Sequence, residues 1–351
     1  KLLVQRTGFK TLAIETGFDA YLINSYLTGK ADDLAKPMRS FYLIYHTREF
    51  VELLTWLRNY NLSVSKEDQV TIYGIDNQHI GNLPDIIFGY LMEVDPVFVN
   101  EAQSRLTYLQ DKLEPRRKHQ YLDDIEYVKA RVNDRKSIYL KHSTEAQWNL
   151  ISRSLEAMTS AVQQSTMANN HGTKAQSIRD EQMLENVKWI INQQPNDARI
   201  ILWGHNGHVQ KVNFNLKRKD HFRLGQGLHE AFDSLYYAVG FDFDKGSFNA
   251  VNYQQGATMQ ACQVTNEKAG SFAAMFRHIL VPCYFFDFQS LEPTKREALL
   301  ATTSMRESGI GFSGEQFTFA NLDVRNAFDG MVFIKQTSAT TFLDVRKIKQ
   351  P

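Results

Sequence analysis

Cysteine and long apolar runs are scarce in this chain of 351 residues. Its two cysteines, Cys262 and Cys283, cannot form a disulfide framework, although one bridge between them stays open. The longest apolar candidate, residues 279–286, is far shorter than the roughly 20 residues that span a bilayer, and Pro282 interrupts it. We therefore expect no membrane span, and the redox compartment stays open.

An excess of one charge is also missing. The chain has 40 basic and 39 acidic residues and a formal net charge of +1, so no strong field favours nucleic acid or an anionic membrane surface as a partner. Its length suffices for one large domain, or for a domain with a substantial insertion. Nonspecific binding driven by charge is therefore not expected, and the oligomeric state is not indicated.

The sequence begins at Lys1 without an initiator methionine or a signal-peptide layout, and its first residues have the pattern of a helix interior. We expect a further piece upstream, which would carry any targeting information. The cellular compartment is therefore not assigned.

Strand and helix signals alternate over the first 80 residues. Residues 11–15 and 69–76 have the pattern of buried strands, residues 20–26 read as helical, and residues 47–60 read as an amphipathic helix capped by Thr47. Strand signals return at residues 199–203, 235–251 with a hairpin turn at 244–246, 278–288 and 330–334. This order predicts a mostly parallel sheet flanked by helices.

The middle of the chain is predicted to be helical, because it is rich in helix formers and poor in β-branched runs. Thr144 and Gln147 fit a capping box. The following residues step by three and four along one face, as expected of a packed seam: Trp148, Ile151, Leu155, Met158 and Val162. A loop is expected at 167–176 and a further helix at 178–192. The prediction is an α/β core domain of residues 1–83 and 195–351, with a helical insertion subdomain of residues 84–194.

Polar side chains follow three of the predicted strands. Glu15 ends the first, Asp76 ends the second, and His205, Asn206 and His208 follow the strand that closes with Trp203. The carboxyl ends of parallel strands meet at one edge of a sheet, where ligands bind. Imidazole and carboxylate groups together suit acid–base chemistry near neutral pH. One cleft lined by these groups is therefore predicted.

Other interpretations of these residues stay open. Asp76 suits a loop or a helix cap equally well, and His205 with His208 could bind a metal, although zinc needs three or four protein ligands and the other histidines lack zinc-type spacing. The chain has no G-x-S-x-G elbow, no cysteine with a histidine motif around it, no P-loop and no dinucleotide fingerprint. No metal and no cofactor are predicted.

Several stretches in a fixed order resemble the erythromycin esterase family. WGHNGHV resembles its W-x-HN-x-H signature, RTGFKTLAIE its GF-x-x-x-A-x-E strand, and VTIYGID its YG-x-D strand. HTREFVELLTWLRNYN, SIRDEQMLENVKWI, LGQGLHEAFDSLYYAVGFDFDKGSF and FDGMVFI are similar to further motifs of that family. The resemblance covers most of the chain apart from the helical middle.

The resemblance implies an α/β fold with a helical subdomain and a hydrolase that activates water without a covalent serine intermediate or an obligatory metal. Its substrates would be esters or lactones, including the macrolides behind bacterial antibiotic resistance. The family's catalytic positions fall on Glu15, Arg179, His205 and His208, with Asn206 between the histidines. We expect Asn206, Asp76 and Trp203 to bind substrate. Arg179 could instead form a structural pair with Asp180 or another carboxylate.

One family motif, G-E-x-x-H-G, would lie upstream of Lys1 and is not in this sequence. Two alternatives therefore accompany the esterase prediction. The chain could be a binding protein for a related small molecule that keeps the cleft without the chemistry, or a metal-dependent hydrolase that uses His205 or His208 with an upstream histidine.

Overall fold

The protein is described by a computed structural model in which the chain divides into two compact units. The structure describes residues 1–167, 172–212, 222–265, 268–294, 297, 304–306, 311–312, 314, 319–322 and 324–344. Unit 1 holds Lys1–Tyr42, Leu53–Trp203 and Asp344–Pro351, and unit 2 holds Leu43–Glu52 and Gly204–Leu343. These bounds differ from the predicted core and insertion, and that division stays a prediction.

Unit 1 contains the predicted parallel sheet, in three strands. Its order is β2 (Thr71–Asp76), β1 (Phe9–Gly17) and β3 (Arg199–Trp203), with β1 in the centre and parallel to both neighbours. Leu12 pairs with Ile72 on one side and with Ile201 on the other. The centre of β1 is apolar because helices pack around it, which leaves Leu12, Ala13 and Ile14 at most 7% exposed.

Helices make up most of the rest of unit 1. The first part of the chain forms α1 (Leu2–Thr7), α2 (Asn24–Leu27), α3 (Ala35–Met38) and α4 (Arg48–Ser63), and residues 48–52 of α4 are assigned to unit 2. The middle forms α5 (Leu83–Val94), α6 (Val99–Leu106), α7 (Lys118–Asp134), α8 (Lys136–Tyr139), α9 (Glu145–Ser165) and α10 (Thr173–Asn192). Thr47 caps α4 as predicted, because its hydroxyl accepts a hydrogen bond from the Phe50 N–H at 3.3 Å.

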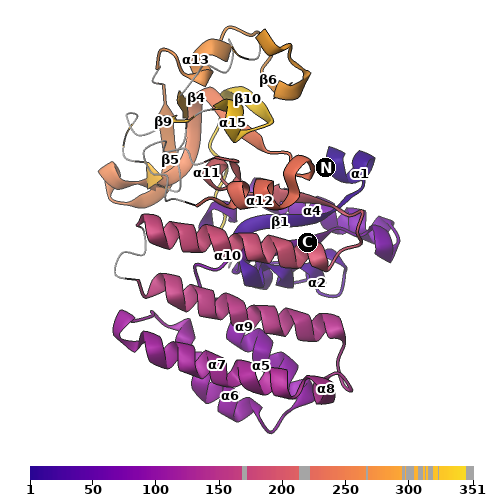
Figure 1. Ribbon diagram of the computed structural model, residues 1–351. Helices are drawn as coiled ribbons and strands as arrows, with labels where there is room; N and C mark the ends of the chain where they lie inside the picture. Colours follow the sequence, from indigo (N-terminus) through magenta and orange to yellow (C-terminus); the bar gives the residue numbers. More distant parts are fainter. Residues whose placement is uncertain are drawn as a thin grey trace. The chain divides into compact units, whose positions relative to one another are not determined.

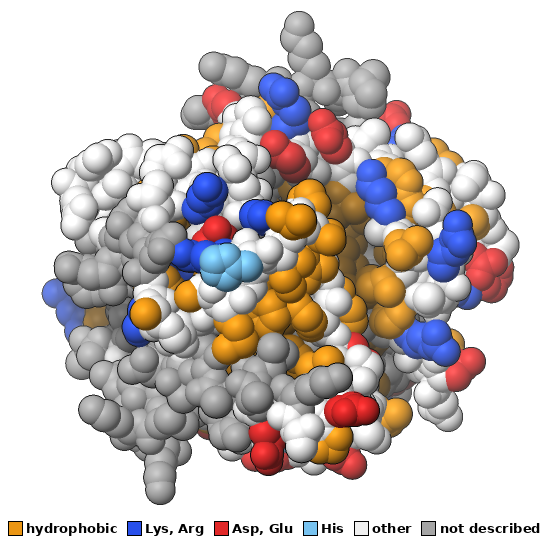
Figure 2. All heavy atoms as spheres, turned by 90° about the horizontal axis from the view of Figure 1, so that it is seen from above, with side chains coloured by type: hydrophobic (Ala, Val, Ile, Leu, Met, Phe, Trp, Pro, Cys, Tyr) orange, Lys and Arg blue, Asp and Glu red, His pale blue; other side chains and the backbone are white. Residues whose placement is uncertain are grey.

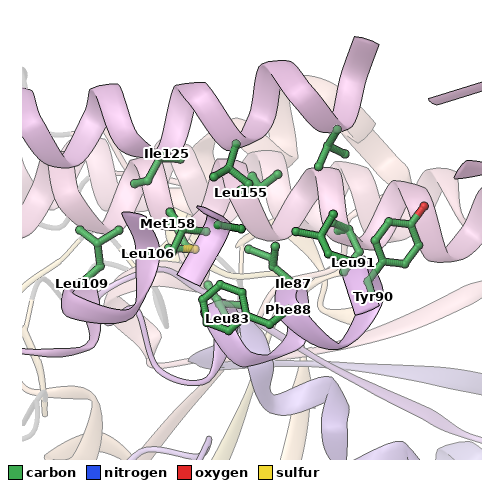
Figure 3. Packing of buried hydrophobic residues seen from close by; sticks show 14 of the residues in the cluster. Leu83, Ile87, Phe88, Tyr90, Leu91, Leu106, Leu109, Ile125, Leu155 and Met158 are labelled. Atoms are coloured by element: carbon green, nitrogen blue, oxygen red, sulfur yellow. The ribbon is translucent and has the colours of Figure 1, made fainter. Parts of the chain in front are cut away.

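Helix α9 has the predicted capping box and the predicted seam. The Gln147 N–H donates to Thr144 Oγ1 at 3.2 Å, and the Thr144 N–H donates to Gln147 Oε1 at 2.9 Å. Along the seam, Leu155 and Met158 are fully buried among side chains of α5, α6 and α7, as Figure 3 shows. Helix α10 lies between α9 and the sheet (Figure 1). It begins at Thr173, so the predicted loop at 167–176 is too long; residues 168–171 lie outside the described residues.

Unit 2 is built on a mixed sheet. Its main path runs β5 (Thr258–Val264), β4 (Val239–Asn252), β10 (Gly330–Thr337) and β6 (Cys283–Asp287), and β8 (Gly311–Phe312) also pairs with β4. β7 (Ser304–Arg306) pairs with β9 (Phe319–Asn321). The helices are α11 (Asn206–Val209), α12 (Leu224–Phe232), α13 (Phe272–Phe276) and α15 (Val324–Ala327). Cys262 and Cys283 are both free thiols.

The hairpin predicted at residues 244–246 is wrong. β4 runs straight through these residues and reverses only after Asn252, where Gly256 has a φ of 86°. Gly246 has a φ of 126°, and a Cβ there would lie 2.2 Å from the carbonyl oxygen of Thr337 on β10. The glycine therefore allows close approach of two strands rather than a turn. The strand predicted over 278–288 is shorter, since β6 covers Cys283–Asp287.

The two faces of the unit 2 sheet differ. Phe272 and Phe276 of α13 pack against Phe333 of β10, with ring centroids 6.3 and 6.1 Å from it. On the other face, Phe241 and Phe285 flank Val332 in register and are 55% and 52% exposed. Figure 2 shows a broad area of hydrophobic side chains on the face that it draws. Among the described helices, none is long and apolar enough to cross a membrane.

From the packing of the helical core of unit 1, we predict that truncating a buried side chain lowers stability. Met158→Ala would leave a cavity among α5, α6, α7 and α9, because Met158 is fully buried. We expect the free energy of unfolding to fall by about 2–5 kcal/mol, as measured by urea denaturation. Met92→Ala is the control, since Met92 is 58% exposed. Equal losses in the two variants would contradict this packing.

From the burial of Asp242 in β4, we predict that the stability of the protein depends on pH. Its side chain is buried, and its Oδ1 accepts a hydrogen bond from the Phe243 N–H at 2.7 Å. Burial raises the pKa of Asp242 to about 7, against the lowering effects of that hydrogen bond and of the Arg306 charge. Because the pKa is higher in the folded state, stability from this group is full at acidic pH and is lost as pH rises to about 7.

Asp242→Asn should therefore flatten the decline in melting temperature between pH 5 and pH 8. The variant cannot ionise at this position, so it does not incur the cost of a buried charge. The matched control is Asp111→Asn, at an exposed position, which should leave the decline as in the unmodified protein. An identical pH profile for Asp242→Asn and the unmodified protein would refute the assignment.

Candidate active site

Glu15 and Asp76 lie at the carboxyl ends of two neighbouring strands, as predicted. The register between β1 and β2 shifts between Ile14 and Gly17, so the backbone around Glu15 bulges out of the regular ladder. A Cβ at Gly74 would lie 1.8 Å from the carbonyl oxygen of Gly17. Only glycine at this position lets β2 approach the bulge, and bulges of this kind commonly redirect a side chain near a site.

Arg179 of α10 joins these two carboxylates. Its Nη2 donates to Asp76 Oδ2 at 2.6 Å and to Glu15 Oε1 at 2.7 Å, and its Nε lies 3.0 and 3.2 Å from the two oxygens of Asp76. The side chains of Arg179, Asp76 and Glu15 are 9%, 0% and 14% exposed. Burial by itself lowers the pKa of Arg179, but the charges of Asp76 and Glu15 outweigh it and raise the pKa. The guanidinium is therefore permanently charged.

Asp76 has further partners in its own loop. The Asn77 N–H donates to its Oδ1 at 2.8 Å, and Gln78 Nε2 donates to its Oδ2 at 3.0 Å. A fully buried carboxylate with donors on both oxygens is well suited to fix the orientation of a guanidinium. The structure thus pairs Arg179 with Asp76 and Glu15. The sequence had left open whether Arg179 pairs with Asp180 or with another carboxylate.

Asn186 anchors the helix that carries Arg179. Its Nδ2 donates to the Ile75 carbonyl at 2.7 Å and to Asn77 Oδ1 at 3.0 Å, while its Oδ1 accepts from Arg153 Nε at 2.7 Å. Asn186 is fully buried, so these bonds tie α10 to the end of β2. The sequence motif SIRDEQMLENVKWI contains Asn186, but the motif alone assigned no role to this residue. Asn186 lies two helical turns after Arg179, and this spacing could have indicated that both side chains lie on the same face of the helix.

Tyr42 is a second residue that sequence reasoning missed. Its N–H donates to Thr16 Oγ1 at 2.9 Å, and its ring packs edge-on against His79 at 5.8 Å. Burial first, and then the charge of Asp76, raise the pKa of Tyr42 well above its ordinary value. Tyr42 lies in no recognisable motif, so nothing in the sequence indicated it.

His205 and His208 belong to unit 2, at the short helix α11. The two rings are 6.5 Å apart, and His208 is buried. His205 caps α11, because its Nδ1 accepts a hydrogen bond from the Gly207 N–H at 3.1 Å. An Nδ1 that accepts a hydrogen bond carries no proton, so the neutral ring of His205 has its proton on Nε2. This nitrogen is then a donor.

Asn206 binds the backbone of β4. Its Nδ2 donates to the Phe241 carbonyl at 2.7 Å, and its Oδ1 accepts from the Phe241 N–H at 3.0 Å. The amide thereby replaces a strand partner at this position and fixes α11, with both histidines, against the sheet of unit 2. The predicted contact of Asn206 with substrate stays a prediction.

The predicted site residues thus fall into two groups. Glu15, Asp76 and Arg179 meet in unit 1, where Trp203, 43% exposed, ends β3 opposite Ile14. His205, Asn206 and His208 lie together in unit 2. Among the described residues, no group of three or more His, Cys, Asp and Glu side chains is arranged to hold a metal ion.

Comparisons with known proteins agree with this architecture. The chain is 22% identical over 383 residues to erythromycin esterase type II of Escherichia coli, covering 97% of this chain and 85% of that protein. A Bacillus cereus crystal structure matches with a TM-score of 0.84 at 20% identity, over 98% of this chain and 84% of the other. A mutant of the erythromycin esterase EreC in its open conformation matches with a TM-score of 0.68 at 15% identity, over 98% and 86%. The sequence model of erythromycin esterase matches residues 4–337, and the chain belongs to the erythromycin esterase family.

Proposed function

We propose that the protein is a hydrolase that opens an ester or lactone bond with an activated water molecule. Membership of the erythromycin esterase family supports hydrolysis at the family level. The observation that carries the proposal is the buried guanidinium of Arg179, held beside Glu15 at the carboxyl ends of parallel strands. A fixed cation where negative charge develops is among the largest catalytic contributions.

The roles of the residues follow from their surroundings. Arg179 would stabilise the oxyanion that forms when water adds to the carbonyl carbon. Asp76 is fully buried and bonded to Arg179, so in place of contacting substrate directly it would orient the guanidinium. Glu15, 14% exposed, is the more accessible carboxylate and would help to take the proton from the attacking water.

The histidines enter the proposal through the W-x-HN-x-H pattern of residues 203–208, which resembles the signature of the family. The proton that Glu15, assisted by His208, takes from the attacking water would pass to the leaving alkoxide, and the neutral ring of His205 would donate a hydrogen bond from Nε2 to the reacting oxygen. Trp203 would line the substrate cleft, and Asn206 would hold both histidines in place.

The first test is hydrolysis itself. The protein is incubated with a panel of macrolides and simple esters, with and without EDTA, and the products are analysed by mass spectrometry. We expect a lactone product heavier by one water and no effect of EDTA. Loss of the product with EDTA would favour the metal-dependent alternative, and binding without any product would favour a binding protein.

Glu15→Gln should reduce kcat by about 10²-fold or more, because the amide cannot accept a proton from water. The fold should survive, since Arg179 keeps its bonds to Asp76. Glu93→Gln on the exposed surface of α5 is the matched control. Full activity of Glu15→Gln on a substrate that the unmodified protein hydrolyses would remove Glu15 from the mechanism.

Asp76→Asn should destabilise the protein as well as inactivate it. The substitution leaves a buried guanidinium without its main counter-charge, and breaking a buried pair costs about 3–5 kcal/mol. Chemical denaturation measures this loss. Asp68→Asn is the comparison, because the Lys10–Asp68 pair is exposed and surface pairs contribute little. Unchanged stability in Asp76→Asn would show that Glu15 alone suffices to hold Arg179.

A further inference from the structure

The short helix α11 depends on its neighbours for its shape. It is a single turn, Asn206–Val209, in which the N–H groups of His208 and Val209 donate to the His205 carbonyl at 2.9 and 3.2 Å. A single helical turn is unstable in isolation, because its formation fixes several residues for few hydrogen bonds. The orientation of His208, which lies within this turn, is therefore set by contacts with other elements of unit 2.

Tyr236 holds the C-terminal end of α11. The last carbonyl groups of a helix have no partner within the helix, and the Val209 carbonyl accepts a hydrogen bond from the Tyr236 hydroxyl instead. Val209 directly follows His208, and both residues are buried. Burial first, and then the charge of Asp329, raise the pKa of Tyr236 well above its ordinary value. The phenol therefore keeps its proton near neutral pH and stays a donor to this carbonyl.

Close packing and an ion pair fix the same end of α11. A Cβ at Gly225 of α12 would lie 2.3 Å from the carbonyl oxygens of Val209 and Gln210, so only glycine lets α12 pack this closely against α11 (Figure 1). Two residues after Val209, Lys211 Nζ pairs with Asp329 Oδ1 at 2.6 Å, and both side chains are largely buried. The Tyr236 hydroxyl adds a directional contact, because a hydrogen bond restricts the direction of the Val209 carbonyl.

We propose that Tyr236 is a positioning residue for His208. Asn206 holds the N-terminal end of α11 on β4, and Tyr236 holds its C-terminal end, so the imidazole between them keeps one orientation. This inference rests on the proposed hydrolysis, in which His208 assists Glu15 as base. Tyr236 itself neither gains nor loses a proton. Its contribution is to the placement of the imidazole, and a misplacement of about 1 Å can lower a rate by about a hundredfold.

The test is Tyr236→Phe, which keeps the ring and removes only the hydroxyl. On a substrate from the panel we expect kcat to fall by about tenfold to a hundredfold with KM little changed, because the base loses its orientation while the substrate contacts stay. Tyr237→Phe is the matched control. The Tyr237 hydroxyl also donates a hydrogen bond, but to Asp287 Oδ1 at 2.9 Å instead of to α11, so this variant should keep the kcat of the unmodified protein.

A second measurement follows the imidazole itself and needs no substrate. The protein is isotopically labelled at histidine Cε1, and the NMR signal of His208 is identified by its loss in His208→Ala. Tyr236→Phe should shift or broaden the His208 signal and leave the signal of His119, an exposed residue of α7, in place. Tyr237→Phe should leave both signals in place. An unchanged His208 signal in Tyr236→Phe would refute the positioning role, with or without hydrolysis.

A double-mutant cycle separates positioning from a general effect on the fold. If Tyr236 acts through His208, Tyr236→Phe should lower kcat little further in the His208→Ala background. An equal loss in both backgrounds would show that the hydroxyl acts independently of His208 and would also refute the role. If the unmodified protein hydrolyses no member of the panel, the proposed function fails, and the His208 signal alone decides whether Tyr236 orients this ring.

Discussion

The pairing of Arg179 with Asp76 and Glu15 is the constraint around which unit 1 is arranged. Two carboxylates face one guanidinium in a place where water has little access, and desolvating three charged groups costs free energy that their attraction only partly returns. Such a cluster is weak support for stability on its own. A charged group already removed from water needs little reorganisation during a reaction, which is the property that the proposed hydrolysis would use.

The surrounding structure holds this cluster in place from two sides. On the sheet side, the bulge in β1 and the glycine at position 74 bring the ends of β1 and β2 together. On the helix side, Asn186 fastens α10 to the end of β2, and Arg153 of α9 fastens Asn186 in turn. The apolar core of α5, α6, α7 and α9 supports α9 from behind. The helices between α5 and α10 thus position the guanidinium of Arg179 as well as forming an apolar core.

Local features of the sequence predicted local features of the structure. The capping box at Thr144 and Gln147 and the cap at Thr47 depend on residues three apart, and both are present. The partners of Arg179 were left open because Asp76 lies 103 residues away, and no local pattern encodes such a contact. The hairpin at 244–246 was wrong because Gly246 serves contact with Thr337, 91 positions further on. Tyr42 was not identified for the same reason, since the charged groups that act on it, among them Asp76 and Arg179, are distant in sequence.

One hydrogen bond sets which nitrogen of His205 carries the proton in the neutral ring. Had His205 Nδ1 carried the proton, its Nε2 could have served as a base. Because Nδ1 instead accepts the Gly207 N–H, the neutral ring can offer only a proton at Nε2. The Asn206 amide is bound to both backbone groups of Phe241. It thereby holds the N-terminus of α11 in place, where the Gly207 N–H selects this tautomer of His205. The W-x-HN-x-H pattern therefore combines a capping acceptor, a positioning amide and a second imidazole within one short segment of the chain.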